Sequence, residues 1–149
     1  MPDWETRPAA PADVEVIAEL RALTLRPDLE RLGRYDEHRV RQRLRDGFVA
    51  EHTLVIEVAG IFAGCVALRP TDDGHWLEHF YLDPSWQGQG IGSDLLSQTL
   101  ARCDREHIVV RVNVLRGSPA RRLYSRHEFT VVTETPVDIF MLRTPRRSG

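Results

Sequence analysis

The spacing of apolar residues along the chain predicts a mixture of helices and strands. Intervals of three and four residues mark a first helix, which opens at Ala10–Asp13 and is expected to end before Pro27. The side of this helix that is expected to face the core carries Val16, Ile17, Leu20 and Leu23.

Three further helices follow from the same spacing and from capping residues. Asp36 suits the N-cap of a helix that ends near Asp46-Gly47 and turns Val40 and Leu44 inward. A short helix is predicted after Ser118 as N-cap and Pro119 in the first turn. Another begins at the end of a glycine-rich segment and has one apolar side, formed by Ile91, Leu95, Leu96, Thr99, Leu100 and Cys103.

Short apolar runs bounded by turn residues predict seven strands. They fall at 4–7, 53–58, 61–68, 76–82, 108–114, 129–133 and 137–142. The resulting order, β-α-α-β-β-β-α-β-α-β-β, predicts an α/β fold with a mixed sheet. A length of 149 residues fits one domain, 1–149, with a full core.

Composition excludes several classes of function. A net charge of −2 gives no support for nucleic-acid binding, and no apolar stretch reaches membrane-spanning length. The chain has no lysine, so a catalytic lysine is excluded. Cys65 and Cys103 are expected in the core, and the histidines show no metal-ligand spacing, so no metal is predicted. With no signal peptide visible, a cytoplasmic protein is expected.

The segment from Gln87 to Ser93 carries the strongest chemical signal. Glycines alternate at 88, 90 and 92, after a predicted strand and directly before a predicted helix. This arrangement presents bare backbone N–H groups at the positive end of a helix, which is a binding site for phosphate or pyrophosphate. A P-loop would need a lysine, and a dinucleotide fingerprint would need different glycine spacing on the first strand of a βαβ unit.

The motif Gln87-Gly88-Gln89-Gly90-Ile91-Gly92 resembles the pyrophosphate loop of the GNAT superfamily of N-acetyltransferases, which use acetyl-CoA. A second resemblance lies in 113–129, where Ala120, Leu123, Tyr124 and Phe129 match a pattern common in that family. Gly117 and Glu128 depart from the pattern, which usually has Asn and Gly there. The predicted element order is also that of the GNAT fold, so the resemblance covers nearly the whole chain.

The resemblance implies a cofactor site between the fourth and fifth strands, which are splayed in this family. It implies that pantetheine pairs with the backbone of Phe80, Tyr81 and Leu82, and that the Leu82 N–H stabilises the oxyanion. Pyrophosphate would bind the backbone of Gln87 to Gly92, with the Ser93 hydroxyl added. The remaining cofactor contacts implied by the resemblance are Asn113, Ser118 and Tyr124.

The resemblance also implies catalytic roles. Tyr124 is the candidate acid for the leaving sulfur, because a phenol is protonated at neutral pH. The candidate base is Glu78, because enzymes of this family often carry a glutamate on this strand, or His79, because a histidine titrates in a suitable range. These adjacent residues are expected on opposite faces of the strand. An ordinary structural role for each is the competing interpretation.

The acceptor is predicted to be a primary amine, on a small molecule or a protein. Arg34, Tyr35 and Arg39 are weak candidates for binding it, since a solvated helix face is the stronger interpretation of these residues. A non-catalytic acyl-CoA binding module is the alternative function, and a nucleotide-binding oxidoreductase is disfavoured by the glycine spacing. GNAT enzymes are often homodimers, and the sequence leaves the oligomeric state open.

Overall fold

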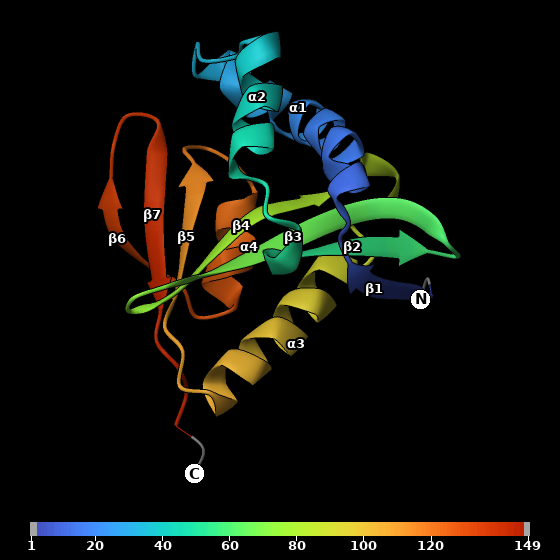
Figure 1. The fold of residues 1–149 in the computed structure, drawn as a ribbon. Coiled ribbons are helices and arrows are strands. Elements are labelled where there is room, and N and C mark those ends of the chain that lie inside the picture. The colour runs from blue at the N-terminus through green and yellow to red at the C-terminus, as the bar shows by residue number, and fades with distance from the viewer. Residues whose placement is uncertain (1–2, 148–149) are drawn as a thin grey trace. The chain divides into compact units, whose positions relative to one another are not determined.

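The computed structural model describes residues 3–147, and Figure 1 labels its helices and strands. This range contains four α-helices and seven strands, in the order predicted from the sequence. The helices are α1 (Val14–Arg31), α2 (Glu37–Gly47), α3 (Ile91–Arg105) and α4 (Ala120–Arg126). The strands are β1 (Trp4–Pro8), β2 (Thr53–Val58), β3 (Ile61–Thr71), β4 (Gly74–Leu82), β5 (Val110–Leu115), β6 (Thr130–Glu134) and β7 (Asp138–Arg143).

The strands form one mixed sheet in the order β1-β2-β3-β4-β5-β7-β6. The chain divides into two compact units: the first runs to Leu68 and adds His79–Ile91, and the second takes Arg69–Glu78 and the chain from Gly92 onward. Strand β4 contributes to both units. The parallel ladder between β4 and β5 covers only His75–Leu77 of β4.

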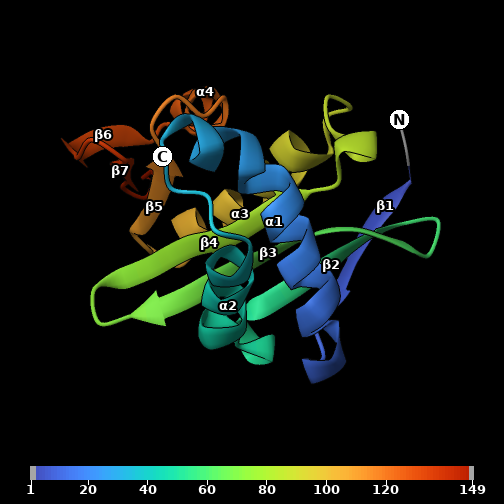
Figure 2. The ribbon, with the colours of Figure 1, turned by 90° about the horizontal axis from the view of Figure 1, so that it is seen from above.

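The first unit packs two helices on antiparallel strands. Figure 2 shows α1 and α2 side by side over β2 and β3. Ion pairs from Arg41 to Glu19 and from Arg45 to Glu15 join the two helices. The core under them consists of buried side chains of both helices and the strands, namely Ile17, Ala18, Leu20, Leu44, Val55, Cys65 and Tyr81.

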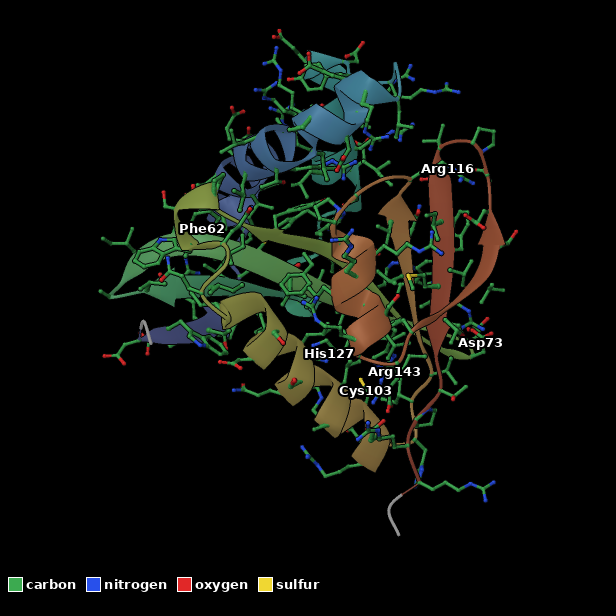
Figure 3. The ribbon with its side chains drawn as sticks, turned by 180° about the vertical axis from the view of Figure 1, so that it is seen from behind. Phe62, Asp73, Cys103, Arg116, His127 and Arg143 are labelled. Atoms are coloured by element: carbon green, nitrogen blue, oxygen red, sulfur yellow. The ribbon has the colours of Figure 1, made fainter. Side chains whose placement is uncertain are left out.

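The second unit places α3 and α4 on one side of β5 and β7 (Figure 3). The predicted apolar side of α3 is confirmed, because Ile91, Leu95, Leu96, Leu100 and Cys103 are all buried. Arg143 of β7 is buried and donates to both carboxylate oxygens of Asp104 on α3, at 2.7 and 3.0 Å. This charge-assisted pair anchors the last strand to the helix that follows the glycine segment.

The first helix differs from the prediction. α1 continues through Pro27 to Arg31, so the expected end before Pro27 is wrong. Proline leaves the Leu23 carbonyl without its N–H partner. Leu23 and Pro27 both lie on the exposed side of the helix, where water can replace that partner.

The inward side of α1 is also rotated by one residue from the predicted one. Val16 and Leu23 are 42% and 54% exposed, so their predicted inward positions are wrong. Ile17 and Leu20 are buried as predicted, and the inward stripe continues to Arg21 and Thr24. An arginine therefore lies on the inner side of this helix.

Capping agrees with the sequence at two helices. The Asp36 carboxylate accepts the Arg39 N–H at 2.8 Å, and Val40 and Leu44 are buried, as predicted. The Ser118 hydroxyl accepts the Ala120 N–H at 3.2 Å, although α4 begins one residue later than expected.

Candidate active site

The segment between β4 and α3 is held in shape by its own side chains. The Asp83 carboxylate accepts the Ser85 N–H at 2.9 Å and caps a short 3-10 turn, Pro84–Trp86. The Gln87 side chain donates to the Leu82 carbonyl at 2.8 Å, and that of Gln89 to the Ser85 carbonyl at 3.1 Å. Both glutamine side chains thus brace the loop, which leaves the backbone of the loop for a ligand.

Two of the loop glycines are required by backbone conformation. Gly88 and Gly90 have φ of +76° and +86°, which side-chain-bearing residues rarely adopt. Both are exposed, and nothing lies within 4 Å of an added Cβ at either position. The loop therefore opens on free space directly before α3, whose first N–H groups have no partner within the helix. These donors and the helix dipole fit the diphosphate of a nucleotide-type cofactor.

The end of β4 presents its backbone in a defined direction. The Asp83 N–H donates to the Ala63 carbonyl of β3 at 2.7 Å, and the Tyr81 carbonyl lies against Gly64 of β3. Since backbone groups alternate between the two edges of a strand, Phe80 and Leu82 direct theirs away from β3. The Leu82 N–H, the predicted oxyanion donor, is therefore on the edge of β4 that β3 does not use.

Glu78 and His79 have different surroundings. The Glu78 carboxylate accepts a hydrogen bond from Arg69 at 2.7 Å, within the second unit. His79 belongs to the first unit, where its ring centroid lies 6.3 Å from that of Tyr81 and its edge faces Gly47. His79 has a positive φ of 50°, so the regular alternation of β4 is interrupted between the two candidate bases.

Tyr124 is buried on α4, in the second unit. Its ring meets that of Phe129 edge-on, with 5.3 Å between the centroids. Its carbonyl accepts the N–H groups of His127 and Phe129 at 3.0 and 3.1 Å, which closes the helix. Glu128 adopts φ of +72° at this turn. That conformation explains why the related pattern prefers glycine at this position.

The Ser93 hydroxyl has a partner that the sequence did not indicate. It lies 3.1 Å from Nε2 of His127, at the C-terminal end of α4. Burial, together with the charges of Arg126 and Arg143, lowers the pKa of His127. The sequence did not predict the contact between Ser93 and His127, because 34 residues separate them.

Asn113 and Ser118, both predicted to contact the cofactor, differ in their exposure. Asn113 has an exposed side chain on β5, opposite Phe140 of β7. Ser118 is partly buried, and its hydroxyl already accepts the Ala120 N–H. A free hydroxyl proton stays available on Ser118 for a ligand.

The residues predicted to bind the acceptor lie in the α1–α2 connection and at the start of α2. Arg34 and Arg39 are exposed. The Arg26 guanidinium lies over the Tyr35 ring, 4.8 Å from its centroid. Arg21, which was not predicted as a site residue, is partly buried in the same unit and donates to the Tyr81 hydroxyl at 3.0 Å. Its position four residues after Ile17 on an inward stripe is the signal that would have found it.

Some site classes receive no support in the part of the chain that the structure describes. Among residues 3–147, no group of three or more His, Cys, Asp or Glu side chains is arranged to hold a metal ion. None of the helices in this range is long and apolar enough to cross a membrane. Cys65 and Cys103 are both free and buried, as predicted, and burial raises the pKa of each thiol, to about 12 for Cys65.

Several solved structures share this fold. The PaiA N-acetyltransferase of Thermoplasma acidophilum, in complex with coenzyme A, is 19% identical with a TM-score of 0.77, covering 95% of this chain and 99% of its own. An N-acetyltransferase of Staphylococcus aureus is 19% identical with a TM-score of 0.70, covering 93% and 99%. An N-acetylglutamate synthase of Neisseria gonorrhoeae, in complex with coenzyme A and N-acetyl-glutamate, is 18% identical with a TM-score of 0.66, covering 99% of this chain and 36% of its own.

Comparison with sequence families gives the assignment. No curated protein sequence is significantly similar to the chain. The acetyltransferase (GNAT) domain family, however, matches residues 48–131, which include β2 to β5, the glycine loop and Tyr124. The protein therefore belongs to the GNAT family of acetyltransferases, whose acetyl donor is acetyl-CoA.

Proposed function

We propose that the protein moves the acetyl group of acetyl-CoA to a primary amine, by direct attack of the amine while both substrates are bound. The observation that carries this proposal is the backbone edge of Phe80 and Leu82 that faces away from β3 and leads into the exposed loop at Gly88 and Gly90. An extended backbone followed by an anion loop suits the pantetheine arm and diphosphate of one ligand.

Binding falls to backbone groups more than to side chains. The N–H groups from Gly88 to Ser93 hold the diphosphate, because the Gln87 N–H donates to the Pro84 carbonyl at 3.3 Å and the side-chain amides of Gln87 and Gln89 donate to loop carbonyls. The Ser93 hydroxyl adds a hydrogen bond while His127 orients it. Phe80, Tyr81 and Leu82 form the strand along which the pantetheine lies, with the backbone groups of Phe80 as its partners, while the Leu82 carbonyl accepts from the Gln87 side chain.

Acetyl-CoA supplies an acetyl group that its thioester activates toward an amine. The Leu82 N–H donates to the carbonyl oxygen as negative charge develops there, and one such donor typically contributes about 10²–10³ in kcat. The Tyr124 hydroxyl gives its proton to the leaving sulfur, and a phenol is protonated at neutral pH. Each role uses a group whose protonation state is already correct at pH 7.

The attacking amine must also be neutral, which calls for a base or a substrate of low pKa. We assign this role to His79, which belongs to the same unit as Leu82, whereas Glu78 belongs to the other unit and accepts a hydrogen bond from Arg69 there. His79 lies beside Tyr81, on the strand end that carries Leu82. His79→Gln should remove the acidic limb of the pH dependence of kcat/KM, while Glu78→Gln should preserve it. The opposite pattern would assign the base to Glu78.

Thermal unfolding with acetyl-CoA, CoA, NAD and ATP tests the cofactor directly. A ligand at 100 times its Kd adds about 2.7 kcal/mol, which raises Tm by roughly 5–10 °C for a chain of this size. Acetyl-CoA and CoA should stabilise the protein, and NAD and ATP should not. Release of free thiol from acetyl-CoA in the presence of a panel of primary amines then tests transfer. Binding without thiol release from any amine would contradict the proposed function.

A matched pair of glycine variants tests the loop. Gly90→Ala should weaken CoA binding, because it strains the loop backbone at φ of +86°. Gly60→Ala is the control, since Gly60 has a similar φ of +78° and equally open surroundings but lies in the β2–β3 turn. Equal loss of CoA affinity in both variants would argue against binding at the loop.

A further inference from the structure

Arg21 occupies an unusual position for a charged residue. It lies on the inward stripe of α1, one turn after the fully buried Ile17 and next to the buried Leu20 and Ala22. Its side chain reaches β4, where Nη1 donates to the Tyr81 hydroxyl at 3.0 Å. The guanidinium is thereby fixed between a helix and the strand that carries Leu82.

The hydrogen-bonding capacity of Arg21 is largely unused. Its Nε is buried and has no hydrogen-bond partner among the described residues. Among residues 3–147, the one hydrogen bond that the Arg21 side chain makes is the one to the Tyr81 hydroxyl. A buried donor without a partner carries the full cost of its desolvation, and the cost is larger for a charged group.

Other arginines of the same unit show what Arg21 lacks. Arg41 and Arg45 each grip both oxygens of one carboxylate, at 2.6 and 3.1 Å on Glu19 and at 2.9 and 2.9 Å on Glu15. These forks lie on the exposed side of the helices, where water could replace the carboxylate. In the first unit Arg41 and Arg45 thus have carboxylate partners, and Arg21 has none among the described residues.

We propose that Arg21 binds a carboxylate of the acceptor, so that the favoured substrates are amines carrying a carboxylate a few bonds from the nitrogen. The inference rests on the proposed function. Tyr81, which holds the guanidinium, is the neighbour of Leu82, whose N–H is assigned to the thioester oxygen. A carboxylate on Arg21 therefore anchors the acceptor beside the side chain that precedes Leu82 on β4.

A carboxylate fits this position better than a phosphate does. One guanidinium neutralises the single charge of a carboxylate, and its planar pair of donors matches the two carboxylate oxygens. A phosphate monoester carries nearly two charges at pH 7, and one guanidinium would leave the second charge unpaired. The carboxylate can belong to a free amino acid or to an acidic side chain next to a peptide N-terminus.

The test compares acceptors that differ only in the carboxylate. kcat/KM is measured by thiol release for L-amino acids and their amides, and for dipeptides with an acidic or an amide second residue. The wild-type protein should prefer the carboxylate member of at least one series by about 10- to 100-fold, the value of one hydrogen bond to a charged group. The series that shows the preference identifies the source of the carboxylate.

Variants then assign the preference to Arg21. Arg21→Met should abolish it, and Arg21→Lys should retain part of it, because lysine keeps the charge and loses the fork. Arg45→Met, which removes an arginine that is already paired, should keep the full preference. Calorimetry with CoA present should show the same pattern in the Kd of N-acetyl amino acids against their amides.

Two results would overturn the inference alone. Either the wild-type protein acetylates amines without preferring carboxylates, or Arg21→Met keeps the preference. The wild-type comparison needs no variant, so it decides the matter even if Arg21→Met fails to fold. Thiol release from no amine at all would overturn the proposed function, and this inference with it.

Discussion

Gly64 of β3 lies against the backbone that is assigned to the reacting thioester. A Cβ at this position would stand 2.3 Å from the Tyr81 carbonyl oxygen and 3.1 Å from the Leu82 Cα. Ordinary contacts begin at 3.4 Å, so Gly64→Ala must move the end of β4 by about 1.1 Å. The obstacle is strand backbone, which cannot turn aside as a flexible side chain can.

The displacement of β4 determines how much Gly64→Ala should lower the free energy of unfolding and kcat/KM. Overpacking costs about 1–3 kcal/mol, and alanine offsets about 0.4–1 kcal/mol of this by reducing the entropy of the unfolded chain. The free energy of unfolding should therefore fall by about 1–2 kcal/mol. A misplacement of about 1 Å at a reacting group can lower the rate by about 100-fold. We expect that loss in kcat/KM for the folded variant, well beyond the unfolded fraction.

Urea denaturation and thiol-release kinetics on the same preparation measure the two effects. Gly47→Ala is the stability control, because its Cβ would meet only the end of the His79 ring, at 3.4 Å. An unchanged free energy of unfolding for Gly64→Ala would refute the close approach of β3 and β4. Lost stability with unchanged kcat/KM would refute the role of the Leu82 N–H.

Three further predictions concern the second unit. Tyr124→Phe should lower kcat with little change in the Kd of acetyl-CoA measured by calorimetry, and unchanged kcat would remove the assignment of Tyr124 as the acid. Asp104→Asn should lower the free energy of unfolding by about 3 kcal/mol in urea denaturation, because it removes the carboxylate that accepts two hydrogen bonds from the buried Arg143 and leaves only Glu128, at 3.7 Å; a change near zero would show that Glu128 or water compensates. Since the pKa of His127 is lowered on folding, the unfolded chain binds more protons, so Tm should fall as the pH drops below 6.5. His127→Gln should flatten that dependence, and an equal slope in both proteins would exclude His127 as its source.

The sequence by itself determined the order of elements and the position of the glycine loop. Both depend on local chemistry: Asp36 caps the helix it precedes, and the glycines at 88 and 90 take backbone conformations that other residues avoid. The GNAT resemblance rested on the same short segments, and the family comparison confirms it.

The sequence predicted the inward side of α1 less well. Leu23 satisfied the spacing of an inward stripe but lies exposed, whereas Arg21 lies inward although its type suggests the surface. Proline usually ends a helix, yet α1 passes through Pro27 because its unpaired carbonyl is on the solvent side. In both cases the outcome depends on which side of the helix meets the strands, and spacing alone leaves a choice of neighbouring stripes.

Only the tertiary structure decided which distant side chains meet. His127 approaches Ser93, Arg143 grips Asp104, and Arg21 reaches Tyr81 across separations of 34, 39 and 60 residues. No local pattern encodes such pairs, because they form when packed strands and helices bring remote segments together. Local propensity thus fixed the scaffold and the conformation of the glycine loop, while long-range packing decided the environment of each charged or titratable side chain.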